Sequence, residues 1–231
     1  DKQNDTGAAI SFDLTFTGGN AVAGSDYTDV SGAGVISITA GATTGTLTVP
    51  VLDDADLEAI ETLQATISNP SNGAVVLATP SATANIADND TANAALSVTT
   101  QGDEAGPQNI VYTVTLDKQN DTGAAISFDL TFTGGNAVAG ADYTDVSGAG
   151  VISIAAGATT GTLSVPVLDD ADLEALETLQ ATISNPSNGA VTVTTPSATA
   201  NITDNDTVNA ALSVTTHGDE NGLVDIVYTV T

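Results

Sequence analysis

The sequence predicts an all-β fold, organised as tandem immunoglobulin-like antiparallel β-sandwiches. Three observations indicate this fold class: a long internal repeat, short runs in which apolar and polar residues alternate, and frequent turn signals between the runs. No stretch shows the 3.6-residue spacing of an amphipathic helix over ten residues, although DADLEALE fits a single helical turn. A closed β-barrel is the alternative arrangement for the same strands.

The internal repeat has a period of 116 residues, because DKQNDTGAAISFDLTFTGGNAVAG begins at Asp1 and again at Asp117. Residues 1–115 aligned with 117–231 give 14 differences and 101 identities over 115 positions. The period predicts a first repeat at 1–90 that lacks its N-terminal strands, a complete second repeat at 91–206, and the N-terminal strands of a third repeat at 207–231. We expect a window from a longer tandem array, whose units fold independently like beads on a string.

Within each repeat, apolar and polar residues alternate along one short run after another, as they do on a strand with one buried face. Turn sequences such as TGGN at 133–136 and NPSNG at 185–189 separate the runs. We expect about seven strands in a repeat, which is typical of an immunoglobulin-like sandwich. Their apolar faces lie within 126–132, 163–167, 179–183, 198–202, 212–214 and 226–230.

The chain is strongly acidic, with 29 Asp and Glu residues against two Lys and Arg, and a formal charge of −27. This charge repels nucleic-acid phosphates and anionic lipids, so neither is expected as a partner. No apolar run approaches the length of a membrane span, so membrane insertion is not expected. The absence of Cys excludes disulfides and thiolate zinc sites. A hydrophobic content of 41% argues against intrinsic disorder.

The acidic residues gather directly after predicted strand ends. In the second repeat VLDDADLEALE contains five acids and ITDND contains two more. Because the loops of a sandwich meet at its two poles, we expect these side chains to converge at one pole. Two carboxylates about 4 Å apart repel by about 4 kcal/mol at an effective dielectric constant of about 20. That repulsion is large beside a total domain stability of about 5–15 kcal/mol.

A hard divalent cation relieves such repulsion, and Ca²⁺ is the expected ion because it accepts about 6–8 oxygen ligands in flexible geometry. Mg²⁺ is the second choice, since it requires a tighter octahedron and retains water. The alternative for a single Asp is a turn residue that hydrogen-bonds its own backbone, which is the interpretation for Asp1, Asp5, Asp13, Asp29 and their equivalents. The candidate metal ligands are Asp142, Asp169, Asp170, Asp172, Glu174, Glu177, Asp204 and Asp206 in the second repeat, and Asp26, Asp53, Asp54, Asp56, Glu58, Glu61, Asp88 and Asp90 in the first.

Five short motifs, in a fixed order, make the sequence resemble the Calx-β domain family. They are AGADYT, GATTGTLSV, DDADLEALE, NPSNG and ITDND. The resemblance extends over essentially the whole chain, and the family is known from sodium–calcium exchangers, integrin β4 and long arrays in bacterial surface proteins. It implies a seven-stranded sandwich that binds calcium at the pole near the end of its last strand.

Carried over motif by motif, the resemblance also implies a ligand set for the second repeat. The implied ligands are Glu104, Asp142, Asp170, Glu174, Glu177, Asp204 and Asp206, with Asp169 adjacent and Asp172 where a backbone carbonyl is expected to ligate. Exchanger domains often carry three consecutive Asp where this chain has Asp169, Asp170 and Ala171, so fewer ions are expected here. The first repeat has no counterpart of Glu104, and its site is therefore expected to be incomplete.

Two functions fit these features. The first is a calcium-stiffened structural extender of a long bacterial adhesin or filament, secreted or at the cell surface; the shared acids of the two copies favour it. The alternative is a calcium-sensing regulatory pair of domains, in which ion binding changes the angle between neighbours. An enzyme is not expected, because the only His, His217, is replaced by Gln101 in the other copy. The expected partners are neighbouring identical repeats in the same chain, with lateral or end-to-end self-association.

Overall fold

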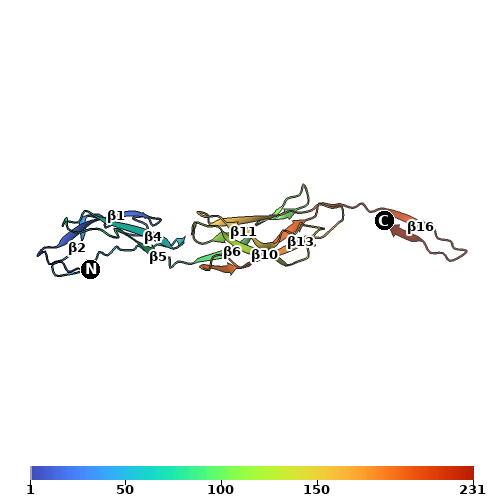
Figure 1. Ribbon diagram of the computed structural model, residues 1–231. Coiled ribbons are helices and arrows are strands. Elements are labelled where there is room, and N and C mark those ends of the chain that lie inside the picture. The colour runs from blue at the N-terminus through green and yellow to red at the C-terminus, as the bar shows by residue number, and fades with distance from the viewer. Residues whose placement is uncertain (1) are drawn as a thin grey trace.

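The computed structural model describes residues 2–231; Asp1, a predicted turn residue, lies outside them. The first repeat, the second repeat and a C-terminal hairpin follow one another along one axis (Figure 1). The described residues contain strands, turns and loops but no helix, so the single helical turn that DADLEALE would fit is absent. Accordingly, they include no helix that is long and apolar enough to cross a membrane.

The strands of the first repeat are β1 (Ile10–Gly19), β2 (Gly32–Ile38), β3 (Leu57–Glu58), β4 (Glu61–Ser68) and β5 (Ser81–Ile86). The second repeat contains β6 (Ala92–Thr100), β7 (Gly102–Asp103), β8 (Ile110–Leu116), β9 (Asn120–Asp121), β10 (Ile126–Gly135), β11 (Gly148–Ile154), β12 (Thr160–Val165), β13 (Glu177–Ser184), β14 (Val191–Thr195) and β15 (Ser197–Thr203). The hairpin consists of β16 (Leu212–Thr216) and β17 (Val227–Val230).

The second repeat is a complete sandwich of two sheets, with strand orders β11-β10-β13-β15-β7 and β12-β8-β6-β14. The predicted alternation is confirmed: along β10, Ile126, Phe128 and Leu130 are buried while the residues between them are partly exposed. The opposite sheet contributes Tyr112, which is fully buried, and its hydroxyl donates a hydrogen bond to the Leu179 carbonyl at 2.6 Å. This hydrogen bond satisfies the phenol, which would otherwise be costly to bury.

A bulge in β10 turns the chain toward the loop that carries Asp142. The register with β13 shifts between Phe132 and Gly134. The next residue, Gly135, has φ +107°, and a Cβ there would lie 2.0 Å from the Thr178 carbonyl oxygen. Only glycine fits this position, since it tolerates positive φ and close backbone contact.

The first repeat forms one sheet of order β2-β1-β4-β5, which matches β11-β10-β13-β15 of the second repeat. Residues 44–49 and 75–79 correspond to β12 and β14, but they form no ladder in the first repeat. In the second repeat, the partners of β12 and β14 are β8 and β6. The counterparts of β8 and β6 at the other end of the chain are β17 and β16, which pair with each other only.

The two repeats meet in a packed junction. Strand β3 of the first repeat pairs in parallel with β9 of the second, through Leu57 with Asn120 and Glu58 with Asp121. The side chain of Leu57 is fully buried and belongs to the hydrophobic core of the second repeat. An ion pair between Lys118 and Asp90 also joins the repeats.

Candidate metal centre

The second repeat brings Asp142, Glu174 and Glu177 together at one pole; we call them the Asp142 cluster. One carboxylate oxygen from each lies within 4.8 Å of the others. Asp142 follows the bulged end of β10, while Glu177 is the first residue of β13 and Glu174 lies in the loop before it. Asp142 is 2% exposed, so this carboxylate sits inside the protein rather than on its surface.

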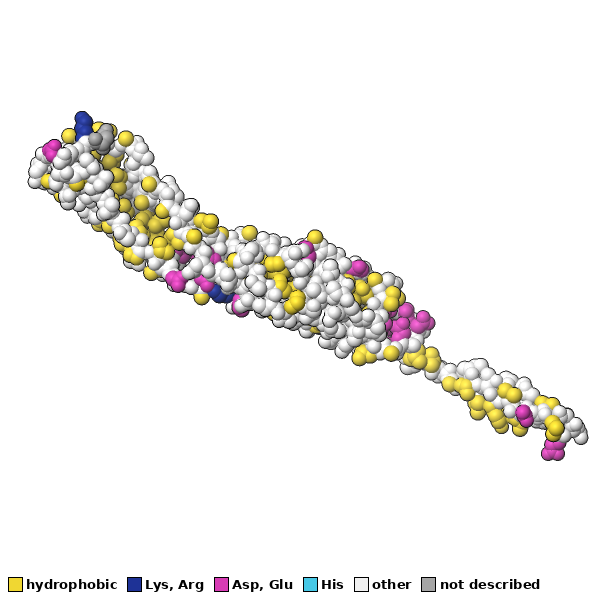
Figure 2. Space-filling model, turned by 90° about the horizontal axis from the view of Figure 1, so that it is seen from below, with side chains coloured by type: hydrophobic (Ala, Val, Ile, Leu, Met, Phe, Trp, Pro, Cys, Tyr) yellow, Lys and Arg dark blue, Asp and Glu magenta, His cyan; other side chains and the backbone are white. Residues whose placement is uncertain are grey.

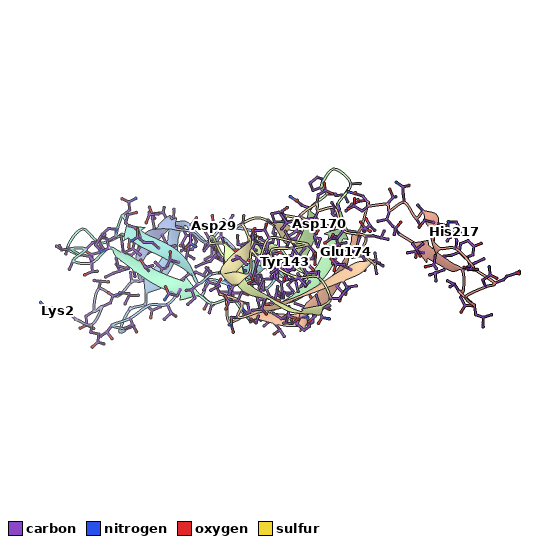
Figure 3. The ribbon with its side chains drawn as sticks, turned by 90° about the vertical axis from the view of Figure 1, so that its right-hand side faces the viewer. Lys2, Asp29, Tyr143, Asp170, Glu174 and His217 are labelled. Carbon is purple, nitrogen blue, oxygen red and sulfur yellow. The ribbon has the colours of Figure 1, made fainter. Side chains whose placement is uncertain are left out.

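A second group, the Glu104 cluster, contains Glu104, Asp204 and Asp206, with oxygens again within 4.8 Å of one another. Glu104 follows β7, and its backbone N–H donates to the Thr203 carbonyl at the end of β15. The side chain of Glu104 is 2% exposed. In Figure 3, Asp170 and Glu174 lie on the side of the second repeat nearer to His217.

Hydrogen bonds from the backbone hold the two acidic loops against each other. Asp204 accepts from the backbone N–H groups of Glu174 and Asp206, both at 2.8 Å. These donors lower the pKa of Asp204, since they favour its charged form. Asn205 donates to Asp169 at 2.8 Å, which adds a side-chain link between the same loops. The loops are therefore preorganised by their own sequence, through the Asp-Asn-Asp run.

Several carboxylate oxygens of the two clusters, and one of Glu61 in the first repeat, are buried without any hydrogen-bond donor. They are Oε2 of Glu61, Glu104, Glu174 and Glu177, and Oδ2 of Asp206. Buried polar atoms in native proteins nearly always have a partner, and an unpaired buried carboxylate is expensive. Neither cluster of the second repeat contains a Lys side chain that could pair with these oxygens. Convergent carboxylate oxygens of this kind fit a hard metal ion such as calcium.

The pKa values of the same groups show the repulsion among the crowded carboxylates. Burial, followed by repulsion from Asp204 and Glu174, raises the pKa of Glu104 to about 7. The pKa of Glu177 is also raised, first by burial and then by its contact with Asp142. Burial and neighbouring carboxylates likewise raise the pKa of Asp206. Each shift means that the protein disfavours the charge that metal binding requires, and a bound cation reverses this preference.

In the presence of EDTA, we expect the melting temperature of the chain to fall as the pH rises from about 5 to about 8. The Glu104 carboxyl has its pKa raised from 4.5 to about 7 in the folded protein. The folded state therefore binds its proton more tightly than the unfolded state. The resulting stabilisation is complete below pH 4.5 and is lost as the pH rises through 7. Differential scanning calorimetry across this pH range measures the slope.

The matched control for this prediction is Glu220, the counterpart of Glu104 at the next repeat position, whose side chain is exposed. Glu104→Gln keeps this one position neutral at every pH, so it should reduce the slope, whereas Glu220→Gln should leave it unchanged. A wild-type melting temperature that is independent of pH in EDTA contradicts the assignment.

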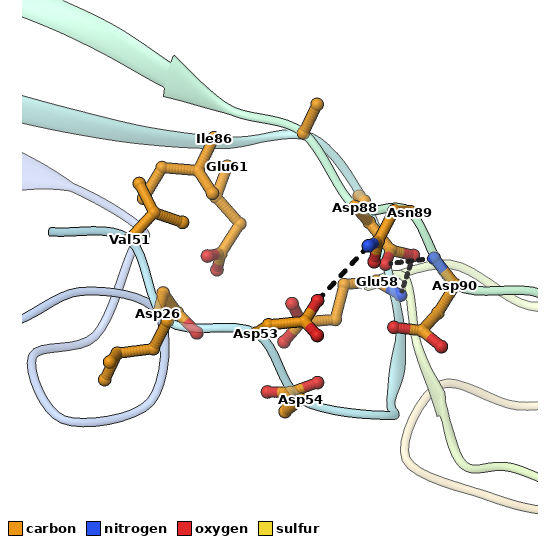
Figure 4. A pocket seen from close by; sticks show the side chains of 13 residues that line it. Asp26, Val51, Asp53, Asp54, Glu58, Glu61, Ile86, Asp88, Asn89 and Asp90 are labelled. Atoms are coloured by element: carbon orange, nitrogen blue, oxygen red, sulfur yellow. Dashed lines mark hydrogen bonds between the residues drawn. The ribbon is translucent and has the colours of Figure 1, made fainter.

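The first repeat contains one acidic cluster, which corresponds to one of the two clusters of the second repeat. The Asp26 cluster (Asp26, Glu58 and Glu61) matches the Asp142 cluster residue for residue, with oxygens within 4.8 Å of one another. It lies in a pocket whose other acidic lining residues are Asp53, Asp54, Asp88 and Asp90 (Figure 4). Among residues 2–90 no acid occupies the place of Glu104, whereas Lys118 of the second repeat contacts Asp90.

Nine of the seventeen predicted ligands therefore fall into three compact clusters, and the others lie around them. Asp53 and Asp169 accept hydrogen bonds from the Asn residues of the two Asp-Asn-Asp runs. Asp54 and Asp170 accept the backbone N–H of Asp56 and Asp172. Asp56 and Asp172 are exposed and belong to no cluster.

Two residues of the site were not predicted from the sequence. Leu57 and Lys118 carry no signal of their own, because each becomes significant only where two repeats meet.

In comparisons with known proteins, one family model matches most of the chain. The model of the Calx-beta domain matches residues 2–90 and 99–206. Among solved structures, the chain is similar to the apo form of the Calx CBD1 domain, with 22% identity over 51% of this chain and 100% of that one, at a TM-score of 0.41. It is also similar to CBD12 from CALX1.2 (14% identity, 88% and 90% covered, TM-score 0.37) and to the calcium binding domain CBD12 of CALX1.1 (17% identity, 80% and 71% covered, TM-score 0.33). The search of curated proteins gives no significant match.

Proposed function

Because the chain belongs to the Calx-beta domain family, we propose that its acidic clusters bind calcium and that the bound ions stiffen a rod of consecutive repeats. Calcium supplies the positive charge that the buried carboxylates lack, and the protein supplies the convergent oxygens. The role is structural: an extender segment of a long adhesin or filament, secreted or exposed at the bacterial cell surface. No catalytic role is proposed.

One observation supports this proposal above the others: the metal cluster and the domain junction share a two-residue strand. In β3, Glu58 belongs to the Asp26 cluster, while its neighbour Leu57 is buried in the core of the second repeat. Fixing the Glu58 carboxylate therefore also restrains the residue that connects the two repeats. A metal ion at this position limits bending at the junction.

The conservation of acids between the two copies supports uniform structural sites. Asp26, Glu58 and Glu61 recur as Asp142, Glu174 and Glu177 within the 101 identical positions, and the resulting clusters have the same composition. Sites that serve as graded sensors need different affinities, which requires different ligand charges or rigidity.

A calcium-sensing role is the second candidate, and the contact between Lys118 and Asp90 favours it. Asp90 is a candidate ligand on the first repeat, and Lys118 belongs to the second. A cation bound by Asp90 competes with the Lys118 ammonium for the same carboxylate. Calcium would then change the contact between the repeats and, through it, their relative angle.

Single-molecule FRET between the two repeats separates the two functions. The chain contains no Cys, so Ser31→Cys and Ser147→Cys, at equivalent exposed loop positions, give one dye on each repeat. A stiff extender predicts the same mean distance with and without calcium, and a narrower distribution when calcium is present. A displaced mean distance would favour the sensor instead, and a distribution unaffected by calcium would contradict both.

A further inference from the structure

The chain enters and leaves the second repeat at opposite ends of its sandwich. Strand β6 begins at Ala92, next to the junction with the first repeat, and β15 ends at Thr203, on the side from which the chain continues to the hairpin (Figure 1). Strand β7, which follows β6, runs parallel to β15. A pull on the two ends of the repeat therefore draws β7 back toward the junction and β15 away from it.

The entering and leaving segments are joined along this parallel pair. Strand β7 forms a ladder with the end of β15. Before β7, the side-chain oxygen of Gln101 accepts a hydrogen bond from the backbone N–H of Asn201 at 2.6 Å. After β7, the backbone N–H of Glu104 donates to the Thr203 carbonyl at 3.1 Å. Residues at both ends of β7 thus extend its contact with β15.

The close approach of β7 to the core depends on Gly102. This residue is buried, and a Cβ on it would lie 2.9 Å from Cγ2 of Val167 and 3.0 Å from Cγ1 of Ile202. Since a side chain has no room there, glycine is the residue that lets β7 lie against both β15 and the core.

We propose that the β7–β15 pair is a mechanical clamp, through which the second repeat resists tension along the rod. Axial tension slides β7 and β15 past each other, so the hydrogen bonds between them are loaded together and must break together. Tension across a sheet instead peels one strand from the next, and its hydrogen bonds break one at a time. The inference rests on the proposed extender role, because an extender is the kind of segment that carries axial load.

The Glu104 cluster lies across the same clamp. Glu104 extends β7, while Asp204 and Asp206 extend β15, and one oxygen from each lies within 4.8 Å of the others. The Glu104 side chain is 2% exposed, and its Oε2 has no hydrogen-bond donor. Figure 2 shows acidic side chains gathered where the second repeat leads into the hairpin. A cation held by these three carboxylates would join the entering segment to the leaving one and add to the axial resistance.

Optical tweezers applied to the full chain in two directions test the clamp. Because the chain has no Cys, handles can be attached at chosen positions. Thr91→Cys with Thr207→Cys, at equivalent exposed positions on either side of the second repeat, applies axial tension. Ser153→Cys with Thr199→Cys, both exposed, on β11 and β15, applies tension across their sheet without loading the β7–β15 pair.

In EDTA, the folded lifetime at constant force should be longer by at least about tenfold under axial tension than under lateral tension, since forced unfolding reports the unfolding rate. Equal lifetimes in the two directions would overturn the proposal. The comparison in EDTA does not depend on calcium, so it can fail while calcium still raises the melting temperature. It can also succeed where calcium has no effect, in which case the proposed function fails and the clamp stands.

Variants locate the resistance within the clamp. Gln101→Ala removes a hydrogen bond between the two segments and should shorten the axial lifetime in EDTA but not the lateral one. Gln119→Ala is the matched control, since Gln119 is exposed and its side chain bonds only the nearby Asp121, so it should change neither lifetime. If Gln101→Ala shortens both lifetimes equally, its effect is on general stability and the proposal is contradicted.

Glu104→Gln tests the contribution of the cation. At saturating calcium it should shorten the axial lifetime at least about tenfold, because a contact that is lost before the transition state for unfolding slows unfolding when present. The lateral lifetime should change much less. The exposed Glu220 belongs to no cluster, so Glu220→Gln should leave both lifetimes unchanged. Equal shortening of both lifetimes by Glu104→Gln would contradict a bridge across the clamp.

Discussion

Replacement of Leu57 by Ala will loosen the two repeats from each other while leaving each of them folded. The Leu57 side chain is fully buried, and it lies in the core of a repeat other than its own. Truncation of a buried Leu costs about 2–5 kcal/mol, and here that cost falls on the docking of β3. We expect the FRET distribution between residues 31 and 147 to broaden even at saturating calcium.

The control for this prediction is provided by the repeat. Leu173 occupies the same position in the same DDADLEA sequence, but it is 57% exposed. Leu173→Ala should change neither the FRET distribution nor the melting temperature by a measurable amount, since exposed substitutions stay within about 0.5 kcal/mol. Equal effects of the two variants would show that the junction does not depend on Leu57.

The fold could be predicted from the sequence because it follows from local patterns. Alternation along 126–132 fixes one buried face, and the glycine and asparagine turns fix where strands stop. Local patterns do not record which copies are covered, although the 116-residue period predicts that residues 1–90 lack the N-terminal strands of their repeat. Tyr112 and Tyr228 have identical neighbours on both sides, yet one is fully buried and the other 62% exposed. Their environments differ only through segments far away in the chain, which no local pattern records.

The convergence of the acidic residues at one pole could be predicted from the sequence, but its details could not. Acids that follow strand ends were expected to converge, and Asp142, Glu174 and Glu177 lie together. The division of the second repeat into two clusters, one around Asp142 and one around Glu104, depends on side-chain direction in the folded loops. The contact of Lys118 with Asp90 depends on how two repeats dock. These features are tertiary, so charge counting along the sequence did not predict them.

Calcium removal is expected to have the largest effect on stability. Each occupied site adds about 2.7 kcal/mol when free calcium is about 100 times the dissociation constant. The two clusters of the second repeat together then contribute about 5 kcal/mol. In a chain of this size, each kcal/mol of added stability raises the melting temperature by about 2–4 °C. The two sites together should therefore raise it by about 10–20 °C. Mg²⁺ should give a smaller rise, since it keeps several waters and demands octahedral geometry.

Variants show where this stabilisation originates. Glu177→Gln removes one carboxylate from the Asp142 cluster and should reduce the calcium-induced rise in melting temperature. Glu220→Gln lies outside every cluster and should retain the full rise.

The central claim is that the crowded carboxylates of each repeat are held together by a bound cation. Its most direct test is the melting temperature of the wild-type chain in calcium and in EDTA at neutral pH: we predict a midpoint higher by about 10 °C or more in calcium, whereas identical midpoints would contradict the claim.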